Sequence, residues 1–137
     1  MKVTLKNITG IVAQDGLEYG RLNDWVNRGF ITPAESSGVQ GRPRWFTAMQ
    51  AVGIVVAARL CTSEQGCVLP FVKTIVDAFS KVDEGWLLEE FKAGWTEFVT
   101  VHQGRLILDG KRPYGMVSVK YAYDAVMDHA QQVEVNT

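Results

Sequence analysis

The stretch ITGIVAQDGLEYGRLNDWVNRGFI, residues 8–31, decides how the first half of this 137-residue chain folds. Its opening part, Ile8 to Gln14, is amphipathic, as expected of a short helix. Asp15 and Gly16 follow, and this pair favours a turn over a continued helix. The sequence therefore predicts one short helix and then a tight turn.

A second helix is predicted after this turn, over Tyr19 to Asn27. Leu22 and Trp25 are three residues apart and so share one face of a helix. Gly29 stands where a glycine commonly terminates a helix. Two short helices joined by a tight turn that contains glycine predict a helix-turn-helix.

The residues from Thr32 to Pro43 are typical of turns and loops, and an arginine-rich run, Gly41 to Phe46, closes this part. We interpret it as a hairpin-like excursion. Thr47, with Gln50 three residues later, has the pattern of a capping box, which predicts the start of a helix that continues to about Leu60. That helix is apolar almost all round, so we expect it to be buried in the monomer or against a partner.

The second half alternates between helical and strand patterns. Apolar residues at helical spacing predict helices, short β-type runs predict strands, and Gln103-Gly104 predicts a turn between two of the strands. The expected elements are helices over Val68 to Lys81, Glu84 to about Ala93 and Tyr121 to Ala130, and strands at Phe98 to Val101, Leu106 to Leu108 and Met116 to Val119. The expected fold class is α+β and mainly α, with a helix-turn-helix domain over 1–81 and a small helix, antiparallel-sheet and helix unit over 82–137.

Residues of the first half are placed as in the winged helix-turn-helix of the MerR regulator family, namely Gly16, Leu22, Trp25, Gly29 and Ile31. The run Gly41 to Phe46 is similar to that family's arginine-rich wing strand, and Cys67 to Phe79 is similar to its fourth helix. The chain resembles the family over about residues 5–80. This resemblance implies a winged helix-turn-helix that binds double-stranded DNA, with a recognition helix over 19–28 and a wing over 38–45.

The chain differs from that family in two places. Asn23 and Asp24 follow the leucine of the recognition helix, where the family commonly has a basic residue, and the family's long dimerising coiled coil is missing. A metal-sensing or drug-sensing arrangement is therefore not implied, no metal or cofactor is expected, and the sequence does not name an effector. Because symmetric DNA sites favour a dimer, we expect the C-terminal unit to mediate homodimer formation. The candidates for this contact are Trp86, Leu87 and Trp95 if they are exposed, and burial in the core would explain these residues equally well.

The candidate DNA-binding residues are of two kinds. Polar side chains on the recognition helix can read base edges, since arginine suits guanine and asparagine suits adenine in the major groove. Arg42 and Arg44 are two residues apart, so an extended strand places both on one side, where they suit phosphates or a narrow minor groove. The base-reading candidates are Tyr19, Arg21, Asn23 and Arg28, and Lys2 and Lys6 are further candidates for phosphate contact.

The net charge of −1 conceals an uneven distribution. Residues 1–60 hold seven Lys and Arg against four Asp and Glu, whereas residues 61–137 hold seven against eleven. A mildly basic N-terminal part and an acidic C-terminal part suit a DNA-binding unit joined to a unit that does not contact phosphate. His102 and His129, the only histidines, have no nearby nucleophile pattern, so we do not expect an enzyme.

The sequence also bears on where the protein acts. The N-terminus has no apolar run typical of a secretory signal. The longest apolar stretch, Ala51 to Leu60, is far shorter than the roughly 20 residues of a membrane-spanning helix. Cys61 and Cys67 do not have the spacing of a metal or redox pair. We expect a soluble cytoplasmic protein with no membrane contact.

Three hypotheses remain open at this point. The first is a sequence-specific transcriptional regulator that binds DNA as a homodimer. The second is an architectural protein of mobile DNA, such as an excisionase or a packaging subunit. The third is a protein-interaction module on a winged-helix scaffold without DNA binding, which Glu18, Asp24 and the near-neutral net charge favour.

Overall fold

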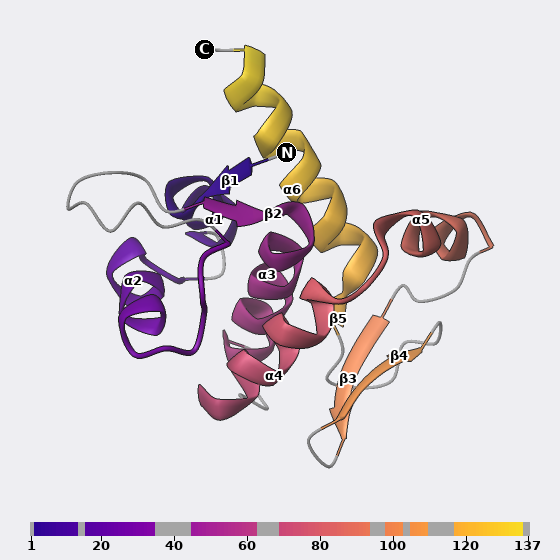
Figure 1. Cartoon of the computed structure of the whole chain (residues 1–137), viewed down its shortest axis with the longest axis horizontal. Coiled ribbons are helices and arrows are strands. Elements are labelled where there is room, and N and C mark those ends of the chain that lie inside the picture. Colours follow the sequence, from indigo (N-terminus) through magenta and orange to yellow (C-terminus); the bar gives the residue numbers. More distant parts are fainter. Residues whose placement is uncertain are drawn as a thin grey trace.

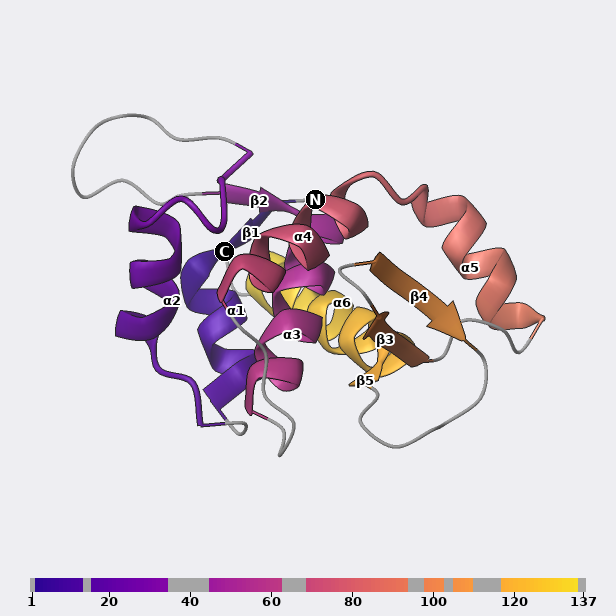
Figure 2. The ribbon, with the colours of Figure 1, turned by 90° about the horizontal axis from the view of Figure 1, so that it is seen from below.

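A computed structural model describes residues 2–13, 16–34, 45–62, 69–93, 98–102, 105–109 and 117–135. These residues form a mainly helical fold with six helices, one two-stranded antiparallel sheet and one three-stranded antiparallel sheet. Helix α3 (Ala48–Thr62) lies at the centre, with α2 (Tyr19–Asn27) and α5 (Glu84–Lys92) at opposite ends of the molecule (Figures 1 and 2). Among the described helices, none combines the length and the apolar composition that crossing a lipid bilayer requires.

The first helix, α1 (Leu5–Val12), begins three residues before the predicted start at Ile8 and ends before Gln14. The early start has a local cause, because Thr4 and Asn7 form a capping box. The Asn7 backbone N–H donates to the Thr4 hydroxyl over 3.2 Å, and the Thr4 backbone N–H donates to the Asn7 side-chain oxygen over 3.0 Å. After the helix the chain turns at Gly16, whose φ of +85° is readily adopted by glycine.

Helix α2 has the predicted bounds, Tyr19–Asn27. Its buried side chains are Leu22 and Trp25, as the spacing indicates. Gly29 has a φ of +81°, and its N–H donates to the Val26 carbonyl over 3.1 Å, which confirms its place at the helix end.

A short sheet that the sequence did not reveal joins the N-terminus to the entry of α3. Strand β1 (Lys2–Thr4) pairs antiparallel with β2 (Trp45–Thr47), so that Val3 lies opposite Phe46, and both of these side chains are buried. The expected excursion falls mostly in 35–44, outside the described residues. The residues that flank this segment are joined, because the Ala34 N–H donates to the Trp45 carbonyl over 2.9 Å.

Helix α3 begins with the predicted capping box. The Gln50 N–H donates to the Thr47 hydroxyl over 3.1 Å, and the Thr47 N–H donates to the Gln50 side-chain oxygen over 3.0 Å. Every residue from 51 to 58 is buried within the monomer. Helices α1, α4 (Leu69–Ser80) and α6 (Val119–Val135) surround it, so the apolar composition is explained without a partner (Figure 2).

The last third of the chain contains the expected helix, antiparallel sheet and helix. After α5, strands β3 (Phe98–His102), β4 (Arg105–Asp109) and β5 (Val117–Ser118) form a sheet in the order β4-β3-β5. Helix α6 is longer at both ends than the predicted Tyr121 to Ala130. It packs against α1 and α3, and its core residues are Val119, Ala122, Tyr123 and Val126.

Helix α5 is held to α6 through Tyr123. The Tyr123 hydroxyl donates to the Glu84 carboxylate over 2.6 Å, and the Tyr123 ring meets Phe91 edge-on with 5.8 Å between ring centroids. Burial, followed by the hydrogen bond to Glu84 and the charges of Glu84 and Asp124, raises the pKa of Tyr123 from 10.0 to about 12. Leu87 is fully buried, which completes the attachment of α5 to the core.

We expect Gly53→Ala to destabilise the fold, because Gly53 of α3 packs tightly against α4. A Cβ at this position would lie 2.9 Å from Phe79 Cβ and 3.1 Å from Val76 Cα, so the two helices must move apart. Such overpacking typically lowers the free energy of unfolding by about 1–3 kcal/mol, measurable by urea denaturation. Gly20→Ala is the matched control, since a Cβ there meets nothing within 4 Å and alanine favours helix. Equal stability of the two variants would contradict this packing.

The raised pKa of Tyr123 predicts a pH-dependent contribution to stability. The folded state holds the phenolic proton more tightly than the unfolded state, so this contribution is complete below pH 10 and is lost as the pH rises toward 12. Tyr123→Phe removes the hydrogen bond and is expected to cost about 1 kcal/mol at pH 8. The difference in unfolding free energy between the wild type and this variant should narrow from pH 10 upward. A constant difference would show that Tyr123 ionises normally.

Candidate nucleic-acid interface

The outward face of α2 carries two rows of polar side chains. Residues three, four or seven apart lie on one side of a helix, so Tyr19, Asn23 and Asn27 form one row and Arg21, Asp24 and Arg28 form the other. Asn23 is half-buried and the remaining five are exposed. Gly20 lies between the rows and is itself exposed. The structure therefore brings the four base-reading candidates, Tyr19, Arg21, Asn23 and Arg28, to the exposed side of one helix.

This face is held in place from behind by apolar contacts. Leu22 and Trp25 point into the core, and Leu17 and Ile31, which flank the helix, are also buried. The Phe30 and Ile31 N–H groups both donate to the Trp25 carbonyl, over 3.0 Å and 3.4 Å. Because the anchor residues lie on the opposite side, the polar rows face outward on a fixed support.

Arg28 is held by two neighbours. Its guanidinium lies 3.5 Å from the Asp24 carboxylate, measured from Nη1 to Oδ2, and 5.3 Å from the centroid of the Phe30 ring. Both side chains of the ion pair are 53% exposed, so water screens much of their attraction. The pair therefore orients Arg28 more than it stabilises the fold.

The charges on this face balance. Between residues 18 and 28, Glu18 and Asp24 offset Arg21 and Arg28. Helix α2 thus offers hydrogen-bonding groups of both signs but no net attraction for phosphate. Any attraction to a polyanion has to come from elsewhere on the protein.

The wing arginines predicted by the sequence, Arg42 and Arg44, lie outside the described residues. Lys2, however, is placed beside Trp45, the first described residue after this segment, by the pairing of β1 with β2. Its Nζ lies 5.7 Å from the centroid of the Trp45 ring, a cation–π contact at the end of the 35–44 segment. The sequence suggested Lys2 only through its charge, because the β1–β2 pairing was not predicted.

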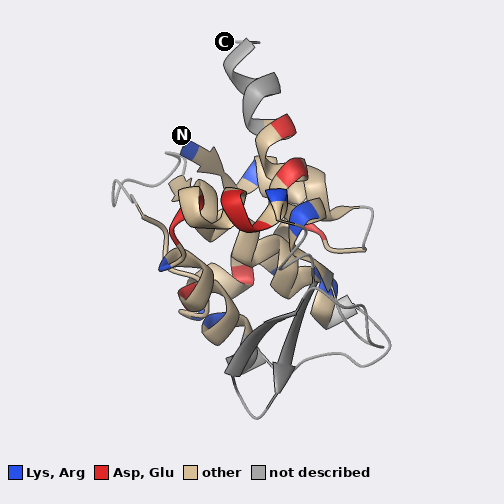
Figure 3. Ribbon diagram, turned by 90° about the vertical axis from the view of Figure 1, so that its right-hand side faces the viewer, with Lys and Arg blue, Asp and Glu red and all other residues tan. Residues whose placement is uncertain are grey.

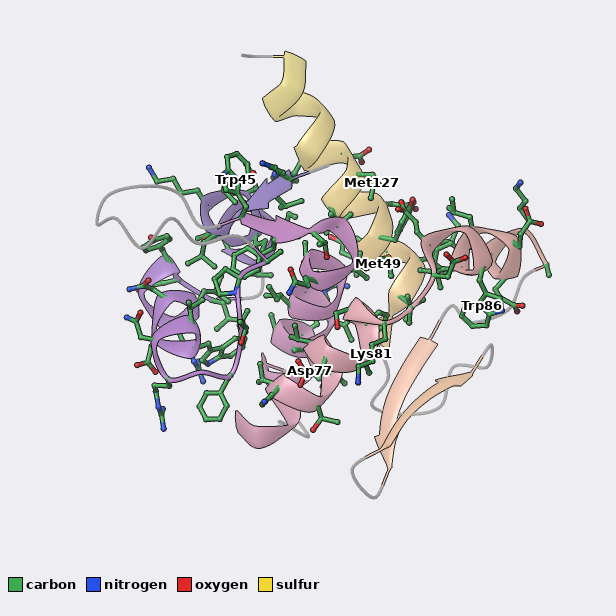
Figure 4. The ribbon with its side chains drawn as sticks, viewed as in Figure 1. Trp45, Met49, Asp77, Lys81, Trp86 and Met127 are labelled. Atoms are coloured by element: carbon green, nitrogen blue, oxygen red, sulfur yellow. The ribbon has the colours of Figure 1, made fainter. Side chains whose placement is uncertain are left out.

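The expected self-association residues are only partly placed. Leu87 is buried inside the monomer, so core burial accounts for it and it cannot contact a second subunit, and Trp95 lies outside the described residues. Trp86 is 45% exposed and its side chain projects below α5 in the view of Figure 4. Acidic residues are visible on the described helices on the side of the molecule that carries α5 (Figure 3). The sequences of α5 and α6 together contain six Asp and Glu and two Lys.

No cluster of three metal-ligating side chains occurs among the described residues. His129 lies against α1, since a Cβ on Gly10 would be 3.3 Å from its Cε1 atom. Comparisons of the chain with protein-family models, with curated proteins and with solved structures found no match.

We expect Asp24→Asn and Arg28→Ala to leave the free energy of unfolding within about 0.5 kcal/mol of the wild type, because an exposed i,i+4 ion pair contributes little. Urea denaturation monitored by tryptophan fluorescence measures this. The result matters because it allows these variants to report on binding without a change in folding. A decrease of about 2 kcal/mol or more in the free energy of unfolding would instead show that the ion pair is needed for the stability of α2.

Proposed function

We propose that the protein binds double-stranded DNA, with α2 in the major groove, and that it acts in the cytoplasm as a transcriptional regulator without catalysing a reaction. The observation that carries this proposal is the outward face of α2. It presents Arg21, Asn23 and Arg28 while Leu22 and Trp25 fix the helix from behind. A helix of this kind fits the major groove, where arginine and asparagine side chains recognise guanine and adenine edges.

In this proposal the affinity for phosphate comes from outside α2. Helix α2 has no net charge between residues 18 and 28, so Arg42 and Arg44, with Lys2 beside the segment that contains them, are the groups that neutralise the backbone. Each phosphate contact releases counterions, and binding becomes weaker as salt is added. In this proposal, α2 recognises the base sequence, and the 35–44 segment and Lys2 provide the salt-dependent affinity.

The proposed regulator is a homodimer, because two α2 helices related by a two-fold axis would read two half-sites of a palindrome. Trp86, exposed on α5 at the far end from α2, is a candidate for the contact between subunits. This arrangement would leave both α2 helices open to DNA.

The balanced charge of α2 favours a second candidate, a protein-interaction module that does not bind DNA. The Asp24–Arg28 ion pair and Glu18 suit a protein surface with charges of both signs. Under this alternative, duplex DNA is not retained at any salt concentration, and substitution of the wing arginines has no effect on function.

Binding to a pool of random duplex DNA, at about 50 mM and about 200 mM salt, separates the two candidates. We expect retention at low salt and a several-fold loss at moderate salt. The Arg42→Ala/Arg44→Ala variant should bind more weakly and with a shallower salt dependence, by about two phosphate contacts. Lys73→Ala is the control, because Lys73 forms a similarly exposed ion pair with Asp77 on α4. Absence of binding by the wild type at both salt concentrations would contradict the DNA-binding proposal.

A further inference from the structure

We propose that the row Arg21, Asp24 and Arg28 reads a short G·C-containing segment of the major groove, and that Asp24 is the residue that sets specificity within it. This inference rests on the proposed DNA-binding function and names the target of the same face. It gives a role to a carboxylate that is otherwise unfavourable beside phosphate.

The spacing of the row matches the spacing of base pairs. Arg28, the C-cap residue of α2, comes seven positions after Arg21, which corresponds to about 10.5 Å along a helix that rises about 1.5 Å per residue. Base pairs along one strand are about 3.4 Å apart, so the two guanidinium groups span about three base-pair steps. Asp24 lies between them on the same side of α2.

The donor and acceptor pattern of the row is complementary to guanine and cytosine. Arginine donates two hydrogen bonds to O6 and N7 of guanine, whereas an ionised carboxylate only accepts and pairs with the N4 amino group of cytosine. Guanine and thymine present acceptors at the corresponding positions and would repel the carboxylate. The order arginine, aspartate, arginine therefore predicts two guanine contacts with a cytosine contact between them.

Arg28 is prepared for this role before DNA is bound. The Asp24 carboxylate at 3.5 Å and the Phe30 ring at 5.3 Å fix the direction of the guanidinium. A guanidinium has five N–H donors, so a single contact with Asp24 Oδ2 is compatible with two further bonds to a base edge. A side chain that is already oriented loses less conformational freedom on binding.

The same carboxylate weakens binding to unrelated sequences. Asp24 and Glu18 cancel the attraction of the two arginines for phosphate, so α2 gains little from a duplex whose bases do not match. Specificity is a difference between affinities, and a repulsive group that acts only on the wrong partner increases that difference.

Asp24→Asn tests this assignment directly, since asparagine pairs with adenine where aspartate accepts from cytosine. Sequencing of the random duplexes retained by the wild type should give guanines about three base pairs apart with a cytosine preference between them. For Asp24→Asn we expect that one position to change from cytosine to adenine, with a preference of about tenfold, and we expect tighter binding to unmatched duplex. Arg28→Ala should remove the guanine preference at one end only.

Asp77→Asn in the Lys73–Asp77 pair of α4 is the matched control and should leave the retained motif unchanged. A motif without guanine, or one that Asp24→Asn leaves unchanged while binding persists, would overturn the inference and leave the proposed DNA binding intact. Absence of retained duplex for the wild type would instead contradict DNA binding itself, and the inference with it.

Discussion

Helix α3 is buried on every side over residues 51–58. This burial is the constraint on which the rest of the structure depends, because other helices must cover α3. Its surface carries no polar stripe, so α1, α4 and α6 must all cover it. Gly53 allows the backbones of α3 and α4 to approach, because a Cβ at this position would meet Val76 and Phe79 of α4. Residues from both halves of the chain meet in this core, from Val3 near the N-terminus to Val126 in α6. The position of α2 follows from this arrangement, because Leu22 and Trp25 belong to the same core.

The sequence predicted those elements whose signals are local. The bounds of α2 and the capping box at Thr47 agree with the structure, because apolar spacing and capping residues act within a few positions of one another. Strand β1 was not predicted, because three residues have too little pattern and the partner, β2, is more than 40 positions away. The sequence left the burial of Leu87 undecided. Trp86, Leu87 and Leu88 are consecutive apolar residues, and only tertiary packing decides that Leu87 is the one that faces the core.

In the candidate site, too, local spacing predicted some features and contacts made by tertiary packing were missed. The positions of Leu22 and Trp25 identify the buried side of the helix. The base-reading candidates therefore fall on its outer side, namely Tyr19, Arg21, Asn23 and Arg28. The ion pair of Asp24 with Arg28 joins residues four positions apart, which are neighbours on a helix surface. The contact of Arg28 with the Phe30 ring depends on the turn at Gly29. The contact of Lys2 with the Trp45 ring depends on a sheet between segments that are distant in the sequence. Neither contact has a signature in the spacing of residues.

In the proposed function, the outward face of α2 is the surface that meets DNA. Chemical-shift mapping of the backbone amides of the full chain, during titration with a retained duplex, tests it most directly. We predict the largest shifts at exposed residues of α2, including Arg21 and Asp24, and at its C-cap Arg28, with little change in α5. Shifts confined to α5, or binding that leaves α2 unperturbed, would contradict DNA binding through α2.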